Sequence, residues 1–192
     1  MTLSYIPSDT NDEGILKATA SGILPNGKPV VVNANGTVSV AAGTSVSSNV
    51  GTSSQYNAGV SGDNQVAFDS SANKFVVAYR DGSNSNRGTA VVGTVSGTNI
   101  SFGTPVVFDT SYIDQITISF NSSVNKMLIA YRDGSTSRAI AGTVSGTSIS
   151  FGSPSNFANN CVSMSQAYDS SSAKSVIAYR DVTSSNYGRA VT

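Results

Sequence analysis

The sequence has no histidine and no tryptophan, and it has a single cysteine, Cys161. Without histidine the chain lacks the commonest general base and the commonest metal ligand, so Ser-His-Asp and Cys-His catalytic arrangements are excluded. One cysteine cannot close an intramolecular disulfide, and we expect Cys161 to be a small, partly buried residue rather than a nucleophile. These residues therefore predict no enzymatic activity, no cofactor and no bound metal.

Charge is also scarce. Charged residues make up 11% of the chain, against roughly 25% in ordinary globular proteins, and 11 basic side chains balance 11 acidic ones. Such a balance creates no field that favours nucleic acid or an anionic membrane as a partner. The N-terminus has no basic or apolar signal region, and no apolar run approaches the length of a membrane span. We expect neither nucleic-acid binding nor membrane insertion.

The chain repeats one stretch three times, beginning at Lys74, Lys126 and Lys174. Each copy is an apolar run followed by Ala-Tyr-Arg-Asp, which predicts a strand that ends in a turn. The three tyrosines are 52 and 48 residues apart, and a period near fifty residues indicates a repeat architecture. The motif residues are Tyr79, Arg80, Asp81, Tyr131, Arg132, Asp133, Tyr179, Arg180 and Asp181.

Each repeat carries the pattern of four short antiparallel strands, and we place the repeats at residues 65–114, 115–162 and 163–192, the third incomplete. We predict an all-β fold, a partial β-propeller-like array, because four strands per fifty residues is typical of a propeller blade. A β-solenoid and a β-sandwich of duplicated hairpins are the alternatives. The third repeat stops where a fourth strand is expected. We therefore expect either a longer protein or an edge that another chain covers.

Two segments precede the repeats. Residues 1–48 are expected to form an N-terminal module, in which Asn35-Gly36 between valine-rich runs predicts a β-hairpin. We expect residues 1–21 to be an extended arm with one short helix or strand, in which residues 12–20 could form a helical turn. Residues 49–64 have the Gly/Ser-rich composition of a flexible linker. The start of the chain is either a frayed terminus or a docking arm, whose candidate contact residues are Leu3, Tyr5, Ile6, Ile15 and Leu16.

The Tyr-Arg-Asp triplet is the one recurrent charged feature, and we expect its role to be structural. Its aspartates are expected to accept hydrogen bonds from loop amides, as Asx-turns do, and its arginines to bridge to the next repeat. The alternative is a ring of Arg and Asp that binds a glycan. Three tyrosines outside the motif could stack on sugars, although we expect each to serve in packing: Tyr56, Tyr112 and Tyr187.

Two stretches resemble a known family. Lys17–Val40 and the repeat from Ala78 to Phe108 are similar to segments of virion structural proteins of tailed bacteriophages, of the tail-fibre and receptor-binding type with propeller-like repeats. The resemblance implies a virion protein whose N-terminus anchors to tail or baseplate proteins and whose β-repeats extend toward a host surface glycan or protein receptor. It also implies a homo-oligomer, usually a trimer.

Other functions stay open. The related alternative is a capsid decoration or head fibre protein, which would place the chain on the head of the virion rather than its tail. A second class is a propeller glycosidase or depolymerase acting on host surface polysaccharide, which would need two carboxylates at a controlled separation. A third class is a bacterial surface lectin or adhesin.

Overall fold

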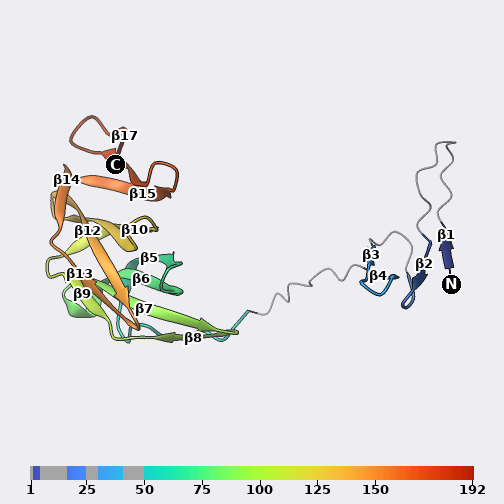
Figure 1. The fold of residues 1–192 in the computed structure, drawn as a ribbon. Coiled ribbons are helices and arrows are strands. Elements are labelled where there is room, and N and C mark those ends of the chain that lie inside the picture. The colour runs from blue at the N-terminus through green and yellow to red at the C-terminus, as the bar shows by residue number, and fades with distance from the viewer. Residues whose placement is uncertain (1, 5–16, 25–29, 41–49) are drawn as a thin grey trace. The chain divides into compact units, whose positions relative to one another are not determined.

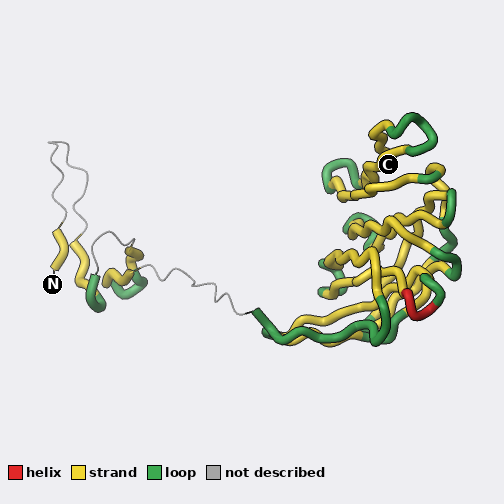
Figure 2. Tube along the Cα trace, turned by 180° about the vertical axis from the view of Figure 1, so that it is seen from behind, coloured by secondary structure: helices red, strands yellow, loops and turns green. Residues whose placement is uncertain are grey.

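The structure is a computed structural model that describes residues 2–4, 17–24, 30–40 and 50–192. The chain forms two compact units, Met1–Asn49 and Val50–Thr192. Strands dominate the described residues of both units, and the one helical element among those residues is a single turn of 3₁₀ helix, η1 (Gly82–Asn84), the red segment of Figure 2. The predicted all-β fold is therefore confirmed. No helix among the described residues has the length and apolarity to cross a membrane.

The described part of the N-terminal unit is a small sheet in the order β1-β2-β4-β3. Its strands are β1 (Thr2–Ser4), β2 (Lys17–Ala20), β3 (Val30–Val32) and β4 (Thr37–Val40). The predicted hairpin is present, since Val30 pairs with Val40 across a turn in which Gly36 has φ of 75°. Of the short helix or strand expected in the N-terminal arm, Lys17–Ala20 is a strand, because pairing with β1 and β4 satisfies its backbone. Residues 12–16, where the helical turn could begin, lie outside the described part.

The second unit consists of three successive sheets, which we call blades 1, 2 and 3 (Figure 1). Blade 1 contains β5 (Ser61–Asp69), β6 (Lys74–Asp81), β7 (Arg87–Ser96), β8 (Asn99–Phe102) and β9 (Val106–Asp109). Blade 2 contains β10 (Ile113–Asn121), β11 (Lys126–Asp133), β12 (Thr136–Ser145), β13 (Ser148–Phe151) and β14 (Ser155–Asn159). Blade 3 contains β15 (Cys161–Asp169), β16 (Lys174–Asp181) and β17 (Tyr187–Val191).

The fourth strand of a blade is split in two. The long β7 pairs with β8 through Gly93–Ser96 and with β9 through Gly88–Ala90, and β12 pairs with β13 and β14 in the same way. Pro105 stands between β8 and β9, where a residue without an amide hydrogen interrupts the ladder. The strand β9 is nevertheless part of the blade, because it pairs with β7.

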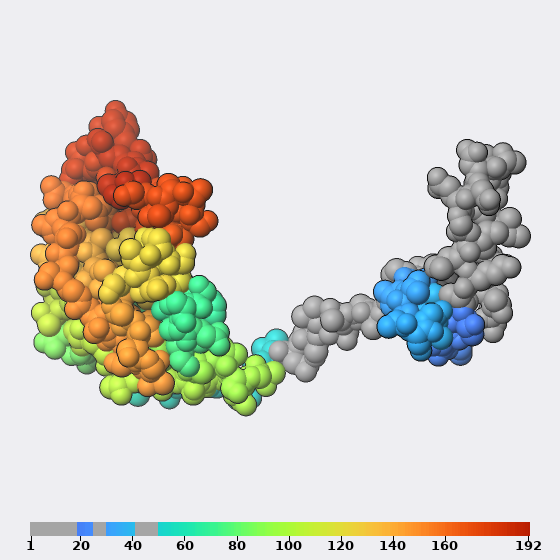
Figure 3. All heavy atoms as spheres, viewed as in Figure 1, coloured from blue at the N-terminus to red at the C-terminus, as the bar shows by residue number. Residues whose placement is uncertain are grey.

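The main core lies between blades 1 and 2. The first strands of the blades are neighbours, with β10 between β5 and β15 (Figure 1), and the space-filling view follows the chain through the blades in order from green to red (Figure 3). Val76 and Val92 of blade 1 pack with Ile129, Met127 and other apolar residues of blade 2. The face of blade 1 that carries Val76 and Val92 is thus buried by blade 2.

The predicted linker is wrong. Its last residues, Ser61–Asn64, belong to β5, and the residues before them lie along blade 1. Tyr56 packs on a second cluster formed by Val77, Tyr79 and Val91, and the Ser54 hydroxyl donates to the carbonyl of Ile100 at 2.8 Å. The Gly/Ser composition suggested flexibility, but one aromatic side chain and a few backbone contacts fix this segment on the blade.

Candidate functional site

The three motif arginines stand near the ends of β6, β11 and β16, beside an irregularity in the first strand of each blade. The register of pairing shifts after Gly62, Asp114 and Val162. The next residues, Asp63, Gln115 and Ser163, have φ between 51° and 55°, a left-handed conformation that is uncommon outside glycine. A β-bulge of this kind re-aims side chains, and here it turns polar groups toward the arginines.

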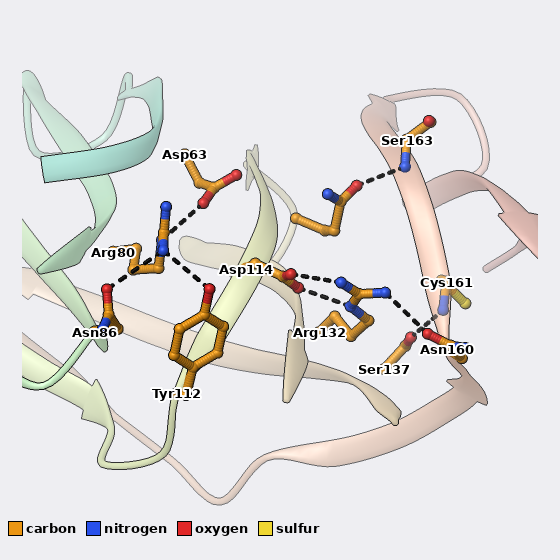
Figure 4. Close-up of polar contacts among 11 residues, drawn as sticks. Asp63, Arg80, Asn86, Tyr112, Asp114, Arg132, Ser137, Asn160, Cys161 and Ser163 are labelled. Atoms are coloured by element: carbon orange, nitrogen blue, oxygen red, sulfur yellow. Dashed lines mark hydrogen bonds and ion pairs between the residues drawn. The ribbon is translucent and has the colours of Figure 1, made fainter. Parts of the chain in front are cut away.

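Arg80 makes contacts in two blades (Figure 4). Its Nε donates to Oδ2 of Asp63 at 3.0 Å, within blade 1. Its Nη1 donates to Oδ1 of Asn86 at 3.3 Å and to the hydroxyl of Tyr112 at 3.1 Å. The guanidinium also lies 5.6 Å from the centre of the Tyr112 ring, which is close enough for a cation–π attraction. Because Tyr112 directly precedes β10, Arg80 joins blade 1 to blade 2.

Arg132 repeats this arrangement one blade further on. Its Nε and Nη2 donate to the two carboxylate oxygens of Asp114 at 2.7 and 2.5 Å, a bidentate pair. Its Nη1 donates to Oδ1 of Asn160 at 2.9 Å. Asn160 directly precedes β15, just as Tyr112 precedes β10. Hydrogen bonding to Asp114 raises the pKa of the Arg132 guanidinium. Arg80 and Arg132 therefore bridge to the following blade, as the sequence predicted for the motif arginines.

We call the set formed by these contacts the arginine ladder. Its two arginines and two aspartates keep between 20% and 28% of their side-chain surface exposed, so a ligand can reach them. Guanidinium groups donate and carboxylates accept in fixed planes, and Tyr112 adds an aromatic face that is 55% exposed. The ladder residues are Asp63, Arg80, Tyr112, Asp114, Arg132 and Asn160.

The third arginine, Arg180, is exposed and forms no ion pair with any carboxylate in the described part of the chain. The residues of β15 that correspond to the acidic positions of the other blades are Val162 and Ser163. Ser163 is still tied to blade 2, because its amide donates to Oε1 of Gln115 at 2.7 Å. Among the described residues, the pair of a motif arginine and an aspartate is therefore formed in blade 1 and in blade 2 but not in blade 3.

The motif aspartates differ in their contacts. Asp81 and Asp181 accept hydrogen bonds from the amides of Ser83 and Thr183, the expected Asx-type contact, and the Thr183 hydroxyl lowers the pKa of Asp181. Asp133 does not make this contact. It pairs with Arg138 at 2.8 Å, beside a two-residue turn in which Gly134 has φ of 58°.

The motif tyrosines are buried to different degrees. Tyr131 is fully buried, and its hydroxyl donates to Oδ2 of Asp109 at 2.8 Å. Burial first, and then this hydrogen bond, raise the pKa of Tyr131 well above its usual range. Burial and the nearby charge of Asp81 raise the pKa of Tyr79 to about 12. Tyr179 is half-buried and lies at the edge of the array. Tyr131 and Tyr179 pack on aromatic rings of the preceding blade, and Tyr79 packs on Tyr56.

The remaining candidate residues divide between the core and the surface. Cys161 is fully buried, and burial raises the pKa of its thiol, so it is the small core residue that the sequence predicted. Tyr56 packs on Tyr79, whereas Tyr187 is exposed and lies outside the ladder. Of the candidate docking residues, Leu3 lies in β1 and pairs with Ala18. The others lie outside the described residues: Tyr5, Ile6, Ile15 and Leu16.

Two other features bear on a binding site: a cavity and the placement of side chains that could hold a metal ion. A cavity of about 300 Å³ opens between blades 2 and 3, near Lys126 and Lys174, at the other end of β11 from Arg132. Its walls are mainly aliphatic, and no carboxylate lines it. Within the described ranges, no group of three or more His, Cys, Asp or Glu side chains is placed to hold a metal ion. The arginine ladder, unlike this cavity, holds several charged side chains in fixed hydrogen bonds.

The sequence identified the two arginines of the ladder but not their partners. Asp63 and Asp114 do not occupy equivalent positions, since Asp63 lies in the bulge and Asp114 directly before it. The separation in sequence between the acid and its arginine therefore differs by one residue, 17 in blade 1 and 18 in blade 2. This near-constant separation is the signal by which the sequence could have identified the two acids.

Arg132 should contribute more to the stability of the fold than Arg180, its counterpart in blade 3. We expect Arg132→Ala to lower the free energy of unfolding by about 1–3 kcal/mol, since it removes charge-assisted bonds from a partly buried pair. Arg180→Ala should change it by less than about 0.5 kcal/mol. Urea unfolding followed by circular dichroism measures both variants. Equal effects would mean that the ladder contacts do not hold the blades together.

Stability should fall at alkaline pH. The pKa values of Tyr79 and Tyr131 are raised above 10.0, the value in an unfolded chain. The fold therefore favours the neutral phenols. Their contribution to the free energy of unfolding is fully present below pH 10 and is lost as the pH rises toward 12. The slope is at most about 1.4 kcal/mol per pH unit for each group. Tyr131→Phe should reduce the slope measured by urea unfolding, whereas Tyr187→Phe, at an exposed position, should not.

No protein-family model matches the chain, and no curated protein or solved structure is detectably similar to it. The chemistry of the ladder must therefore be inferred from its own geometry. Donors, acceptors and one aromatic face alternate along it, and both carboxylates are engaged by arginine. This arrangement suits the recognition of hydroxyl-rich or anionic groups.

Proposed function

We propose that this chain is a structural attachment protein of a tailed-phage virion, of the tail-fibre type. In this proposal the unit Met1–Asn49 joins the particle, and the blades present the arginine ladder to a glycan on the host surface. The observation that carries the proposal is the ladder itself, which repeats across blades and stays partly exposed. Many weak contacts of this kind gain strength when several copies bind together.

A glycan is the ligand class that fits the ladder best. Sugar hydroxyls can accept from guanidinium groups and donate to carboxylates, and a sugar ring can lie on the exposed face of Tyr112. The division of the chain into two units is consistent with separate anchoring and recognition. The sequence resemblance of Lys17–Val40 and of the repeats supports the virion setting.

The virion setting is tested on intact particles. Purified phage particles that encode this chain should contain it, as detected by mass spectrometry, and cryo-electron microscopy should locate residues 1–49 against tail or baseplate proteins. A position on the capsid lattice would instead identify a head decoration protein. If the chain is absent from particles, the virion proposal is wrong.

Removing the aromatic face of the ladder should weaken glycan binding. We expect Tyr112→Ala to lower the affinity for a bound surface polysaccharide about tenfold or more, as loss of one aromatic contact does at a binding site. Tyr112→Phe keeps the ring and should retain most of the affinity. A panel of bacterial surface glycans, followed by titration of any that bind, measures both variants. If Tyr112→Ala binds as the unchanged chain does, the ladder is not the glycan site.

A further inference from the structure

Residues 50–57 correspond to the fourth strand of a blade. Gly51 occupies the position of Gly103, and Tyr56 that of Phe108, each 52 residues later. The contacts match as well: the Tyr56 ring lies 5.1 Å from that of Tyr79, and the Phe108 ring lies 5.2 Å from that of Tyr131. The segment therefore lies against blade 1 just as β9 lies against blade 2.

Among the described residues, this segment does not pair with the third strand of any blade. In blades 1 and 2 the fourth strand pairs with the third strand of its own blade, through Thr89 and Val107 or through Arg138 and Asn156. Residues 1–49 contain no Ala-Tyr-Arg-Asp copy, and residues 50–60 form no strand with any described residue. Residues 50–55 are exposed. The segment is a fourth strand without its blade.

Blade 3 has the complementary gap. Among the described residues β17 pairs with β16 alone, so its other edge, which carries β9 or β14 in the other blades, is unpaired. The far face of blade 3 is uncovered too: Ala178 is exposed, whereas its equivalents Ala78 and Ala130 are fully buried. An unpaired strand edge beside an uncovered face is a template for another chain.

We propose that a second copy of this chain fills the gap, so that copies associate head to tail. Residues 50–57 of one copy lie along β17 of the other, and blade 1 of the first copy covers blade 3 of the second. The repeat fixes the register. Since Ala90 pairs with Val106 and Ala139 with Ser155, Ala190 pairs with Ser54 of the other copy.

The proposed contact between two copies has the same arrangement as a junction between two blades of one copy. It repeats the junction between blades 1 and 2, with Tyr56 in the role of Phe108. Contacts that join different patches close into rings when the rotation allows it, and propellers close with about four to eight blades. Two copies of a three-bladed chain fall within this range, so the expected assembly is a dimer. The inference does not depend on the ligand of the ladder.

The test uses two full-length single-cysteine additions, Ser54→Cys and Ala190→Cys, each a small and exposed residue. Opposed residues in a sheet lie close enough for a disulfide. When the two variants are mixed and oxidised, we expect a disulfide that joins one copy of each. Cys161 is fully buried and stays out of the reaction. Ser54→Cys mixed with Ser145→Cys, an exposed residue at the end of β12 in blade 2, is the matched control and should give no such product.

The oligomeric state of the unchanged chain provides the second measurement. Sedimentation equilibrium should show association that increases with concentration. A monomer at every concentration, without the 54–190 disulfide, overturns the proposal. An oligomer that lacks this disulfide also overturns it, because the copies would then meet elsewhere, for instance through residues 1–49.

Discussion

Tyr131→Ala is expected to lower the free energy of unfolding of the blade unit by about 3–5 kcal/mol, the usual cost of removing a large aromatic side chain from a core. Tyr131 is fully buried. Its ring lies 5.2 Å from that of Phe108, which comes from the preceding blade. The substitution therefore leaves a cavity at the junction of two blades. Urea unfolding of the full chain, followed by circular dichroism, measures the loss.

The same substitution in blade 3 provides the matched control. Tyr179 occupies the equivalent place in its repeat, and its ring lies 5.8 Å from that of Phe157. It is only half-buried, however, so Tyr179→Ala removes less buried surface and should cost less than half as much. If both variants lose the same stability, the two junctions are equally tight and the exposed edge of blade 3 is not open in solution.

Removal of the hydroxyl alone separates packing from hydrogen bonding. In Tyr131→Phe the carboxylate of Asp109 loses one donor but keeps the amide of Ser111 at 2.8 Å. Arg138 also stays nearby, at 3.6 Å. The fold therefore tolerates this variant better than Tyr131→Ala, which is why it suits the alkaline titration.

The strands within each repeat could be predicted because local signals agree there. An apolar run, a short polar turn and a second apolar run describe β6 and β7, and the structure pairs Val77 with Val91 as that pattern requires. The repeat of fifty residues gave the number of blades. These features depend on neighbours in sequence, so no information about distant contacts was needed.

The contacts between blades could not be predicted in the same way. Residues 50–57 differ from residues 102–109 at most positions, and only glycine, threonine and an aromatic residue stand at matching places. Composition therefore suggested a linker, although the spacing of 52 between Gly51 and Gly103 was a usable signal. The partners of the arginines depend on a bulge that moves the acid by one residue, a backbone feature that side-chain periodicity does not reveal.

Gly103→Ala is expected to destabilise the blade unit by about 1–3 kcal/mol, the usual cost of an overpacked contact. Gly103 lies just after β8, and its amide donates to the carbonyl of Val92 at 2.8 Å. A Cβ at this position would overlap the backbone carbonyl oxygen of Thr147, in the turn between β12 and β13. Backbone atoms cannot rotate away, so blade 1 and blade 2 would have to move apart.

Gly152 provides the matched control for this prediction, because it occupies the same position one repeat later. Its amide donates to the carbonyl of Ala141 at 3.1 Å, and a Cβ there would meet nothing within 4 Å. Gly152→Ala should therefore change the free energy of unfolding by less than about 0.5 kcal/mol. Thermal or urea unfolding compares the two variants directly. Equal stability of the two variants would show that blades 1 and 2 are not in close contact at Thr147. The packing of blade 1 against blade 2 would then be wrong at this point.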